Sequence, residues 1–314
     1  MKHLRNLFDI TPDDFFEILD LSTEIKFDFQ NGIRKPLLER KILALIFEKP
    51  SLRTRNSFEA AMMQLGGGSL FLTTEETGMN GRESTTDIAK VIGGYSDFLV
   101  LRTFSQQLID EFASHACCPV VNALSDEFHP CQALTDMLTI RECLGTLAGK
   151  KIVYLGDSNN VAASLAIASA MTNCRLHICG PEGYEFSASF LSRLQQEYPV
   201  FEIEKSSTPS QAVTDADVIY TDVWASMGQE AESQARKQAF ADFRVDVELM
   251  RQAPPDCLFL HPLPAHRGEE VTDDVIDGPQ SQVFAQANNR MHIAKGLLVW
   301  LASKTENNSV LESS

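Results

Sequence analysis

Short apolar runs alternate with amphipathic stretches in the first half of the chain. Segments whose apolar residues recur at helical spacing lie between shorter apolar runs that have the length of β-strands. We expect strands at residues 42–47, 70–73, 98–103 and 120–123, and helices after Thr11 and at residues 54–65, 84–95 and 131–143. Strands that alternate with helices in this way indicate βα units, so this half predicts an α/β domain with a mainly parallel sheet.

The second half repeats this pattern after a break at Gly145 and Gly149. We expect strands at residues 152–156, 176–179, 201–204, 218–220 and 258–260, with helices at 161–171 and 190–197. The chain therefore predicts two doubly wound domains, residues 1–147 and 148–288, with ligands bound in the cleft between them. An amphipathic run at 289–303 predicts a C-terminal helix, within 289–314, that returns to the first domain. The polar segment after Lys304 is expected to fray.

The charge balance excludes several kinds of partner. The 314 residues include 27 Lys and Arg against 43 Asp and Glu, a formal net charge of -16. Nucleic acids and anionic membranes require a basic surface, so neither is expected as a partner. No apolar run approaches the roughly 18 residues of a membrane span, and we expect a soluble, cytoplasmic protein. The 7 cysteines form no CxxC pair, so neither a disulfide framework nor a zinc ribbon is indicated.

The strongest local signal for chemistry is the segment FEKPSLRTR at residues 47–55. An apolar strand ends there, a loop with hydroxyls and cations follows, and a helix opens near Thr54. Free backbone N–H groups at a helix start, together with guanidinium groups, suit a phosphate. Taken alone, the segment fits a solvated, routinely capped helix start equally well.

Other polar groups follow the predicted strands, at the edge where ligands of α/β sheets bind. Arg102 ends one strand, where a guanidinium without an anion would be costly. His129 and Gln132 open a helix, and a His at a helix start tends to be neutral and able to donate to a carbonyl oxygen. Asp222 closes a strand of the second half, which suggests a cationic amine as its partner. The GDSNN segment at 156–160 lacks the GxGxxG glycines, which argues against a nicotinamide cofactor.

Taken together, these segments resemble the aspartate/ornithine carbamoyltransferase family, and most closely its ornithine branch. The resemblance spans nearly the whole chain. It rests on SLRTR (51–55), LRT (101–103), HPCQ (129–132), GDSNN (156–160), DVWASMG (222–228), HPLPAHRGEE (261–270) and NNR (288–290).

The resemblance implies transfer of a carbamoyl group from carbamoyl phosphate to the δ-amine of L-ornithine, with no metal or organic cofactor. The residues implied for carbamoyl phosphate are Ser51, Leu52, Arg53, Thr54, Arg102, His129, Pro130, Cys131, Gln132, Pro262, Leu263 and Arg290, of which Arg53, Arg102, His129 and Arg290 would be catalytic. Those implied for ornithine are Asn160, Asp222, Ser226 and Met227. Family members are commonly trimers, and residues 77–84 would be the loop that a neighbouring subunit lends to the site.

Two positions depart from the ornithine branch. Pro262 stands where that branch usually has Cys, and Gly78 stands where the loop usually has Gln, a loss for which Arg82 could compensate. Two alternatives therefore stay open. One is a carbamoyltransferase for another amine, such as an acylated ornithine, putrescine or aspartate, and the other is a non-catalytic relative.

Overall fold

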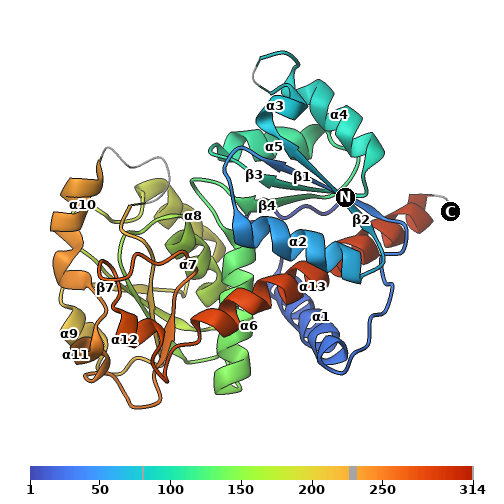
Figure 1. Cartoon of the computed structure of the whole chain (residues 1–314). Coiled ribbons are helices and arrows are strands. Elements are labelled where there is room, and N and C mark those ends of the chain that lie inside the picture. Colours follow the sequence, from blue (N-terminus) through green and yellow to red (C-terminus); the bar gives the residue numbers. More distant parts are fainter. Residues whose placement is uncertain (80, 226–231, 313–314) are drawn as a thin grey trace. The chain divides into compact units, whose positions relative to one another are not determined.

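The computed structural model describes residues 1–79, 81–225 and 232–312, and the chain folds into two compact units (Figure 1). The first unit contains Met1–Leu138 and Asn288–Ser314, and the second contains Thr139–Ala287. Two helices, α6 (Pro130–Leu144) and α13 (Val283–Glu312), contain the points of division. The first unit is therefore built from two separate stretches of sequence.

The first unit contains a parallel sheet in the order β2-β1-β3-β4. Its strands are β1 (Ile42–Phe47), β2 (Gly68–Thr73), β3 (Phe98–Arg102) and β4 (Val120–Leu124). Its helices besides α6 and α13 are η1 (Leu7–Asp9), α1 (Pro12–Gln30), α2 (Leu52–Gln64), α3 (Thr74–Thr77), α4 (Thr85–Tyr95) and α5 (Gln106–His115). All four predicted strands are confirmed, with ends that differ by at most two residues. Helices α3 and α5 were not predicted.

Both faces of this sheet are covered. On one face, Ala44 and Leu99 pack in a buried cluster with Ile88 of α4 and Phe112 of α5. Figure 1 places α1, α2 and α13 on the opposite face. Strands buried on two sides read as continuous apolar runs, which is why β1 reads ILALIF rather than alternating.

The close packing of α13 on α1 depends on a glycine. A Cβ at Gly296 would lie 2.1 Å from Ser22 Oγ and 2.8 Å from the Ser22 backbone nitrogen. Any larger residue would therefore push the two helices apart. This packing fixes the position of the α13 residues that follow the division.

The second unit contains a parallel sheet in the order β7-β6-β5-β8-β9. Its strands are β5 (Lys151–Leu155), β6 (Arg175–Cys179), β7 (Ile203–Ser206), β8 (Val218–Thr221) and β9 (Leu258–Leu260). Its helices are α7 (Asn160–Thr172), α8 (Ala188–Glu197), α9 (Pro209–Ala212), α10 (Ser233–Phe240), η3 (Ala241–Phe243), α11 (Val247–Met250) and α12 (Asp273–Ile276). One face packs Val153, Ile219 and Phe259 against Phe240 and Val275. The predicted α/β class with parallel sheets is confirmed in both units.

The C-terminal helix differs from the prediction at its start. It begins at Val283 rather than near residue 289, and it ends at Glu312, within the predicted range 289–314. The segment from 305 to 312 contains neither Pro nor Gly, so nothing in it stops a helix that has already begun. Within the described residues, no helix has the length and apolar character to cross a membrane.

Strand order locates the ligand-binding edge of each sheet. From β1 the chain turns to β2 on one side, whereas β3 lies on the other side, so the connections diverge between β1 and β3. The same divergence occurs between β5 and β8 in the second unit. The register aligns Phe47 with Arg102 and Leu155 with Thr221, so the ends of each strand pair are level. Open α/β sheets bind ligands at such switch points, outside the carboxyl ends of the strands.

Candidate active site

The loop after β1 forms the first part of the candidate site. Ser51 is the N-cap of α2, and its Oγ accepts a hydrogen bond from the Thr54 backbone N–H at 3.2 Å. Because Ser51 caps the helix, α2 starts at Leu52, two residues before the predicted start. The Leu52 side chain is 75% exposed, so this position offers a ligand its backbone N–H at the helix start.

Arg102 brings a guanidinium to the same edge from the end of β3. It is buried, and its Nη1 donates to Thr54 Oγ1 at 3.4 Å. Its Nε has no acceptor among the described residues. Burial, followed by the charges of Arg290 and Arg53, lowers the pKa of Arg102 from 12.5 to about 10. The site therefore holds a cation that its surroundings do not neutralise.

Arg290 of α13 connects α2 with the start of α6. Its Nη2 donates to Thr54 Oγ1 at 3.2 Å. Its Nη1 donates to Gln132 Oε1 and, at 3.3 Å, to His129 Nε2. Three of the predicted residues, from two separate segments of sequence, thus meet around the guanidinium of a third segment.

His129 stands directly before α6 and is buried. Burial, followed by the charges of Arg290 and Arg102, holds the pKa of His129 well below 6.5, so the ring is neutral at pH 7. Arginine can only donate, so Nε2 accepts in this contact and the neutral ring carries its proton on Nδ1. The neutral state agrees with the prediction for a His at a helix start, whereas donation to a carbonyl oxygen stays a prediction.

The amide of Gln132 is oriented by a buried carboxylate one turn along α6. Gln132 Nε2 donates to Asp136 Oδ1 at 2.8 Å, and Asp136 is fully buried. Because the amide nitrogen is bound to Asp136, the amide oxygen faces Arg290. Asp136 was not predicted as a site residue, although its spacing of four residues from Gln132 on a helix places both on one face.

The other two residues of the HPCQ segment contribute little beyond their backbone. Cys131 Sγ donates to the Asn122 carbonyl at 3.4 Å, inside the unit. Burial raises the pKa of this thiol to about 12, which keeps it protonated. Pro130 is the first residue of α6, where the missing N–H costs nothing.

The site in the first unit concentrates positive charge. Burial and the charge of Arg290 lower the pKa of Arg53. Neither Arg53 nor Arg102 forms an ion pair with a carboxylate of the described chain. Lys49, in the same loop, differs from them because its Nζ is paired with Asp126 Oδ1 at 2.5 Å. Unpaired guanidinium groups in this arrangement suit a small, highly charged anion.

In the second unit, Asp222 follows β8 at the switch point. Its Oδ2 accepts from Asn159 Nδ2 at 2.9 Å, and its Oδ1 accepts from the Val223 backbone N–H at 2.8 Å. Burial raises the pKa of this carboxyl. Asn159 also caps α7 through the N–H groups of the helix start. Asn160, the residue that the family resemblance indicates, is the first residue of that helix and is half-buried.

The HPLP segment is held in place by a buried His. His261 Nδ1 accepts from the Leu263 backbone N–H at 3.0 Å, so the neutral ring carries its proton on Nε2 and donates to Glu270 Oε1 at 3.2 Å. Leu263 adopts a left-handed φ of 55°, and the bond to Pro264 is cis. His261 and Glu270 therefore fix the backbone at Pro262 and Leu263. Neither residue was predicted for the site, because their pairing depends on the folded loop.

The remaining predicted positions are two ornithine-binding residues and the 77–84 loop. Ser226 and Met227 lie outside the described residues. In the 77–84 loop, Arg82 packs against the spot that a side chain at position 78 would occupy, since a Cβ on Gly78 would lie 3.0 Å from Arg82 Nε.

Within the described residues, one cluster has the spacing of a metal site, formed by His266, Glu269 and Glu270. Glu269 Oε1 is bound to Lys237 at 2.6 Å. Glu270 Oε1 accepts from the His266 backbone N–H and from His261. The acidic residues of this cluster thus have partners within the protein.

Comparison with protein families and solved structures gives a consistent result. Residues 2–142 match the aspartate/ornithine carbamoyltransferase carbamoyl-P binding domain, and residues 148–301 match the Asp/Orn binding domain of the same family. The ornithine carbamoyltransferase of Bacillus subtilis is 46% identical over 311 residues, which cover 97% of this chain and 95% of that protein. The anabolic ornithine carbamoyltransferase of Pyrococcus furiosus is 46% identical over 299 residues, with 95% of each chain covered.

Solved structures agree with the sequence matches. The ornithine carbamoyltransferase structure from Pyrococcus furiosus superposes with a TM-score of 0.91 at 45% identity, covering 95% of this chain and 96% of that one. The anabolic enzyme from Campylobacter jejuni gives a TM-score of 0.89 at 34% identity, covering 97% and 100%. The chain belongs to the aspartate/ornithine carbamoyltransferase family.

Proposed function

We propose that this protein transfers the carbamoyl group of carbamoyl phosphate to the δ-amine of L-ornithine, which gives L-citrulline and phosphate in arginine biosynthesis. The observation that carries the proposal is the cluster of arginines around Thr54 in the first unit, of which Arg102 and Arg290 are buried and Arg53 is half-buried. Burial and mutual repulsion lower the pKa values of Arg53 and Arg102, so a dianion relieves both costs when it binds. The ornithine-branch relatives support the choice of amine.

In this proposal the phosphate group binds at the start of α2. The Ser51 hydroxyl and the backbone N–H groups of Leu52, Arg53 and Thr54 surround it, because a helix N-terminus offers free donors and a favourable dipole. The guanidinium groups of Arg53 and Arg102 supply the opposite charge.

The carbamoyl group lies against α6 and Arg290. Gln132 Oε1, oriented by Asp136, accepts from the carbamoyl NH2. Thr54, His129 and Arg290 donate to the carbonyl oxygen, which becomes an oxyanion when the amine attacks. Donors placed in this way typically contribute about 3 kcal/mol each to the transition state.

Ornithine binds at the switch point of the second unit. Asp222 holds the α-amino group, together with Asn160, Ser226 and Met227. The Leu263 backbone is held by the hydrogen bond from its N–H to His261 Nδ1. Its carbonyl accepts from the carbamoyl nitrogen and from the attacking amine. An alkylammonium has a pKa near about 10.4 and must lose a proton before it attacks. Pro262 has no thiol, so the leaving phosphate takes this proton.

We also propose that the functional domains are residues 1–147 and 148–288, with 289–314 returning to the first domain. The protein forms trimers in the cytoplasm, where residues 77–84 of one subunit complete the site of its neighbour. Neither metal nor organic cofactor takes part.

The decisive assay measures the ureido product formed from carbamoyl phosphate and a panel of amines: ornithine, N-acetylornithine, putrescine and aspartate. We expect citrulline from ornithine alone. Arg102→Ala should lower turnover by orders of magnitude, whereas Arg40→Ala, at a side chain that is 90% exposed, should not. Exclusive use of another amine would overturn the choice of substrate. Tight binding of a bisubstrate analogue without turnover would mean a non-catalytic relative.

A further inference from the structure

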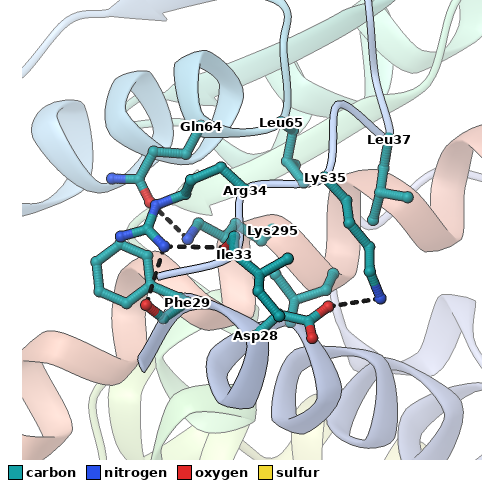
Figure 2. A pocket seen from close by; sticks show the side chains of 10 residues that line it. Asp28, Phe29, Ile33, Arg34, Lys35, Leu37, Gln64, Leu65 and Lys295 are labelled. Atoms are coloured by element: carbon teal, nitrogen blue, oxygen red, sulfur yellow. Dashed lines mark hydrogen bonds and ion pairs between the residues drawn. The ribbon is translucent and has the colours of Figure 1, made fainter. Parts of the chain in front are cut away.

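Two clusters of charged side chains outside the proposed substrate contacts differ in how completely their members bind one another. The first surrounds a small hollow of the first unit (Figure 2). There Lys35 Nζ lies 2.7 Å from Asp28 Oδ2. Lys295 Nζ donates to Gln64 Oε1 at 2.6 Å, so these groups have their partners within the hollow. The second cluster, in the loop after β9, includes a buried carboxylate oxygen that accepts from no group of the described chain.

The second cluster is formed by His266, Glu269 and Glu270, which a tight turn brings together. The Glu269 N–H donates to the His266 carbonyl at 2.8 Å. The Gly268 N–H donates to the Val271 carbonyl, also at 2.8 Å, and Gly268 adopts the left-handed φ of 91° that the turn requires. As a result, His266 Nδ1 lies 3.9 Å from Glu269 Oε2 and 3.9 Å from Glu270 Oε2.

Glu270 is the buried member of the cluster, with a side chain that is 0% exposed. Its Oε1 accepts from His261 Nε2 and from the His266 backbone N–H. Its Oε2 has no hydrogen-bond donor within the part of the chain that the structure describes. A buried carboxylate oxygen without a partner is costly and uncommon in folded proteins. This oxygen therefore needs a positive group that the described chain does not supply.

Glu269 and His266 form the outer side of the cluster. Glu269 Oε1 is bound to Lys237 Nζ at 2.6 Å, which leaves Oε2 on the side of His266. The His266 side chain is 51% exposed, so solvent reaches the cluster from this side. One oxygen of each carboxylate is thus held by the protein, while the other faces the same imidazole nitrogen.

The neighbouring cation does not fill this position. Arg267 belongs to the same turn, but its Nη1 lies 2.7 Å from both Asp273 Oδ1 and Asp277 Oδ2. Among the described residues, no Lys or Arg lies within ion-pair distance of Glu270. Two carboxylates and one imidazole are therefore balanced by the single charge of Lys237, at the outer carboxylate.

We propose that His266 Nδ1, Glu269 Oε2 and Glu270 Oε2 bind a Zn²⁺ ion. Zinc binds imidazole nitrogen and carboxylate oxygen at about 2.1 Å, so two of its ligands lie at most about 4.2 Å apart. Both 3.9 Å distances from His266 meet this limit. The imidazole favours zinc over magnesium and calcium, which prefer oxygen ligands.

The ion has both an inner support and an open side. His261 donates to the other oxygen of Glu270, the kind of contact that orients a ligating carboxylate. Water completes the tetrahedron on the exposed side of His266. The ion touches no proposed substrate group, so the proposal does not depend on the proposed function.

Isothermal calorimetry of the whole protein with ZnCl2, after treatment with EDTA and dialysis, tests the site. Cys117 and Cys143 are exposed thiols, so the protein and its variants carry Ser at both positions. His266→Ala and Glu269→Ala each remove one ligand from the outer side, where folding does not depend on it. His115→Ala is the matched control at another exposed His.

Zinc should bind with equal affinity to the parent protein and to His115→Ala, and at least about tenfold more weakly to His266→Ala and Glu269→Ala. It should also raise the melting temperature of the parent but not of His266→Ala, because only binding to the folded state stabilises it. Unchanged zinc affinity in either ligand variant, or no zinc binding by the parent, would overturn the proposal.

Two further titrations test the kind of ligand. CoCl2 should give visible absorption without the strong near-ultraviolet band of a thiolate ligand, and this absorption should be lost in His266→Ala. A thiolate band would place the ion at a buried cysteine instead and would overturn the assignment. MgCl2 should bind far more weakly than zinc, and equal affinity for the two ions would contradict the role of the imidazole.

Discussion

Arg102 should make the empty protein less stable and the occupied protein more stable. A pKa lowered from 12.5 to about 10 means that burial, together with the charges of Arg290 and Arg53, costs the charged side chain about 3 kcal/mol relative to the unfolded chain. Since about 10 is still above neutral pH, the side chain is charged at pH 7 in both states, and the folded state carries the whole cost. The long hydrogen bond to Thr54 offsets about 1 kcal/mol of it. Arg102→Met should therefore stabilise the ligand-free protein by about 2 kcal/mol.

The same change should remove the response to phosphate. A ligand at one hundred times its Kd stabilises the folded state by about 2.7 kcal/mol. Arg102→Met lacks a main anion contact, so orthophosphate at a concentration that saturates the wild type should stabilise it far less. At about 2–4 °C per kcal/mol for a domain of this size, the ligand-free variant should melt about 4–8 °C above the wild type. With phosphate present, this advantage should shrink or reverse.

Scanning calorimetry with and without orthophosphate measures both effects. Arg40→Met is the control, because its side chain is 90% exposed and its removal should change neither melting temperature. Two results would refute the reasoning. One is a ligand-free Arg102→Met protein that melts below the wild type, and the other is an undiminished phosphate shift in that variant.

Three further changes test other parts of the structure. Burial lowers the pKa of His292 from 6.5 to about 4, so the imidazole gains a proton at higher pH in the unfolded chain than in the folded one. The protein should therefore lose about 2 kcal/mol of stability as the pH falls from 6.5 to 4. His292→Gln should flatten this pH dependence, measured by urea unfolding. Gly296→Ala should lower the urea midpoint by the equivalent of about 1–3 kcal/mol, because its Cβ would collide with Ser22, and an unchanged midpoint would contradict the close packing. Asp136→Leu should raise the KM for carbamoyl phosphate about tenfold by freeing the Gln132 amide, and Asp136→Asn, which keeps an acceptor, should recover most of it in steady-state kinetics.

The sequence allowed the strands and their functional edge to be predicted well. Residues 42–47 and 258–260 form strands with the predicted ends, because continuous apolar runs between polar loops have one simple interpretation. The rule that ligands bind outside the carboxyl ends of parallel strands then placed Arg102 and Asp222 at the ligand-binding edges of their sheets.

The partners of the site residues could not be predicted in the same way. Asp136 and Glu270 act on Gln132 and His261 through side-chain contacts that local periodicity does not encode. Asn159 was missed although a residue that caps a helix after a strand is recognisable from sequence alone. The C-terminal helix begins at Val283, six residues before the predicted start at residue 289.

The division of the first unit has a consequence for synthesis. Arg290, which contacts Thr54 and Gln132, is translated only after the whole of the second unit, residues 139–287. At about 5–20 residues per second, the ribosome needs roughly 7 to 30 s for that stretch. A nascent chain that has emerged only as far as the second unit therefore lacks one of the guanidinium groups of the anion site. The residues proposed for the phosphate, Ser51, Arg53 and Arg102, are already present at that stage, whereas the contacts of Arg290 with Thr54 and Gln132 form last.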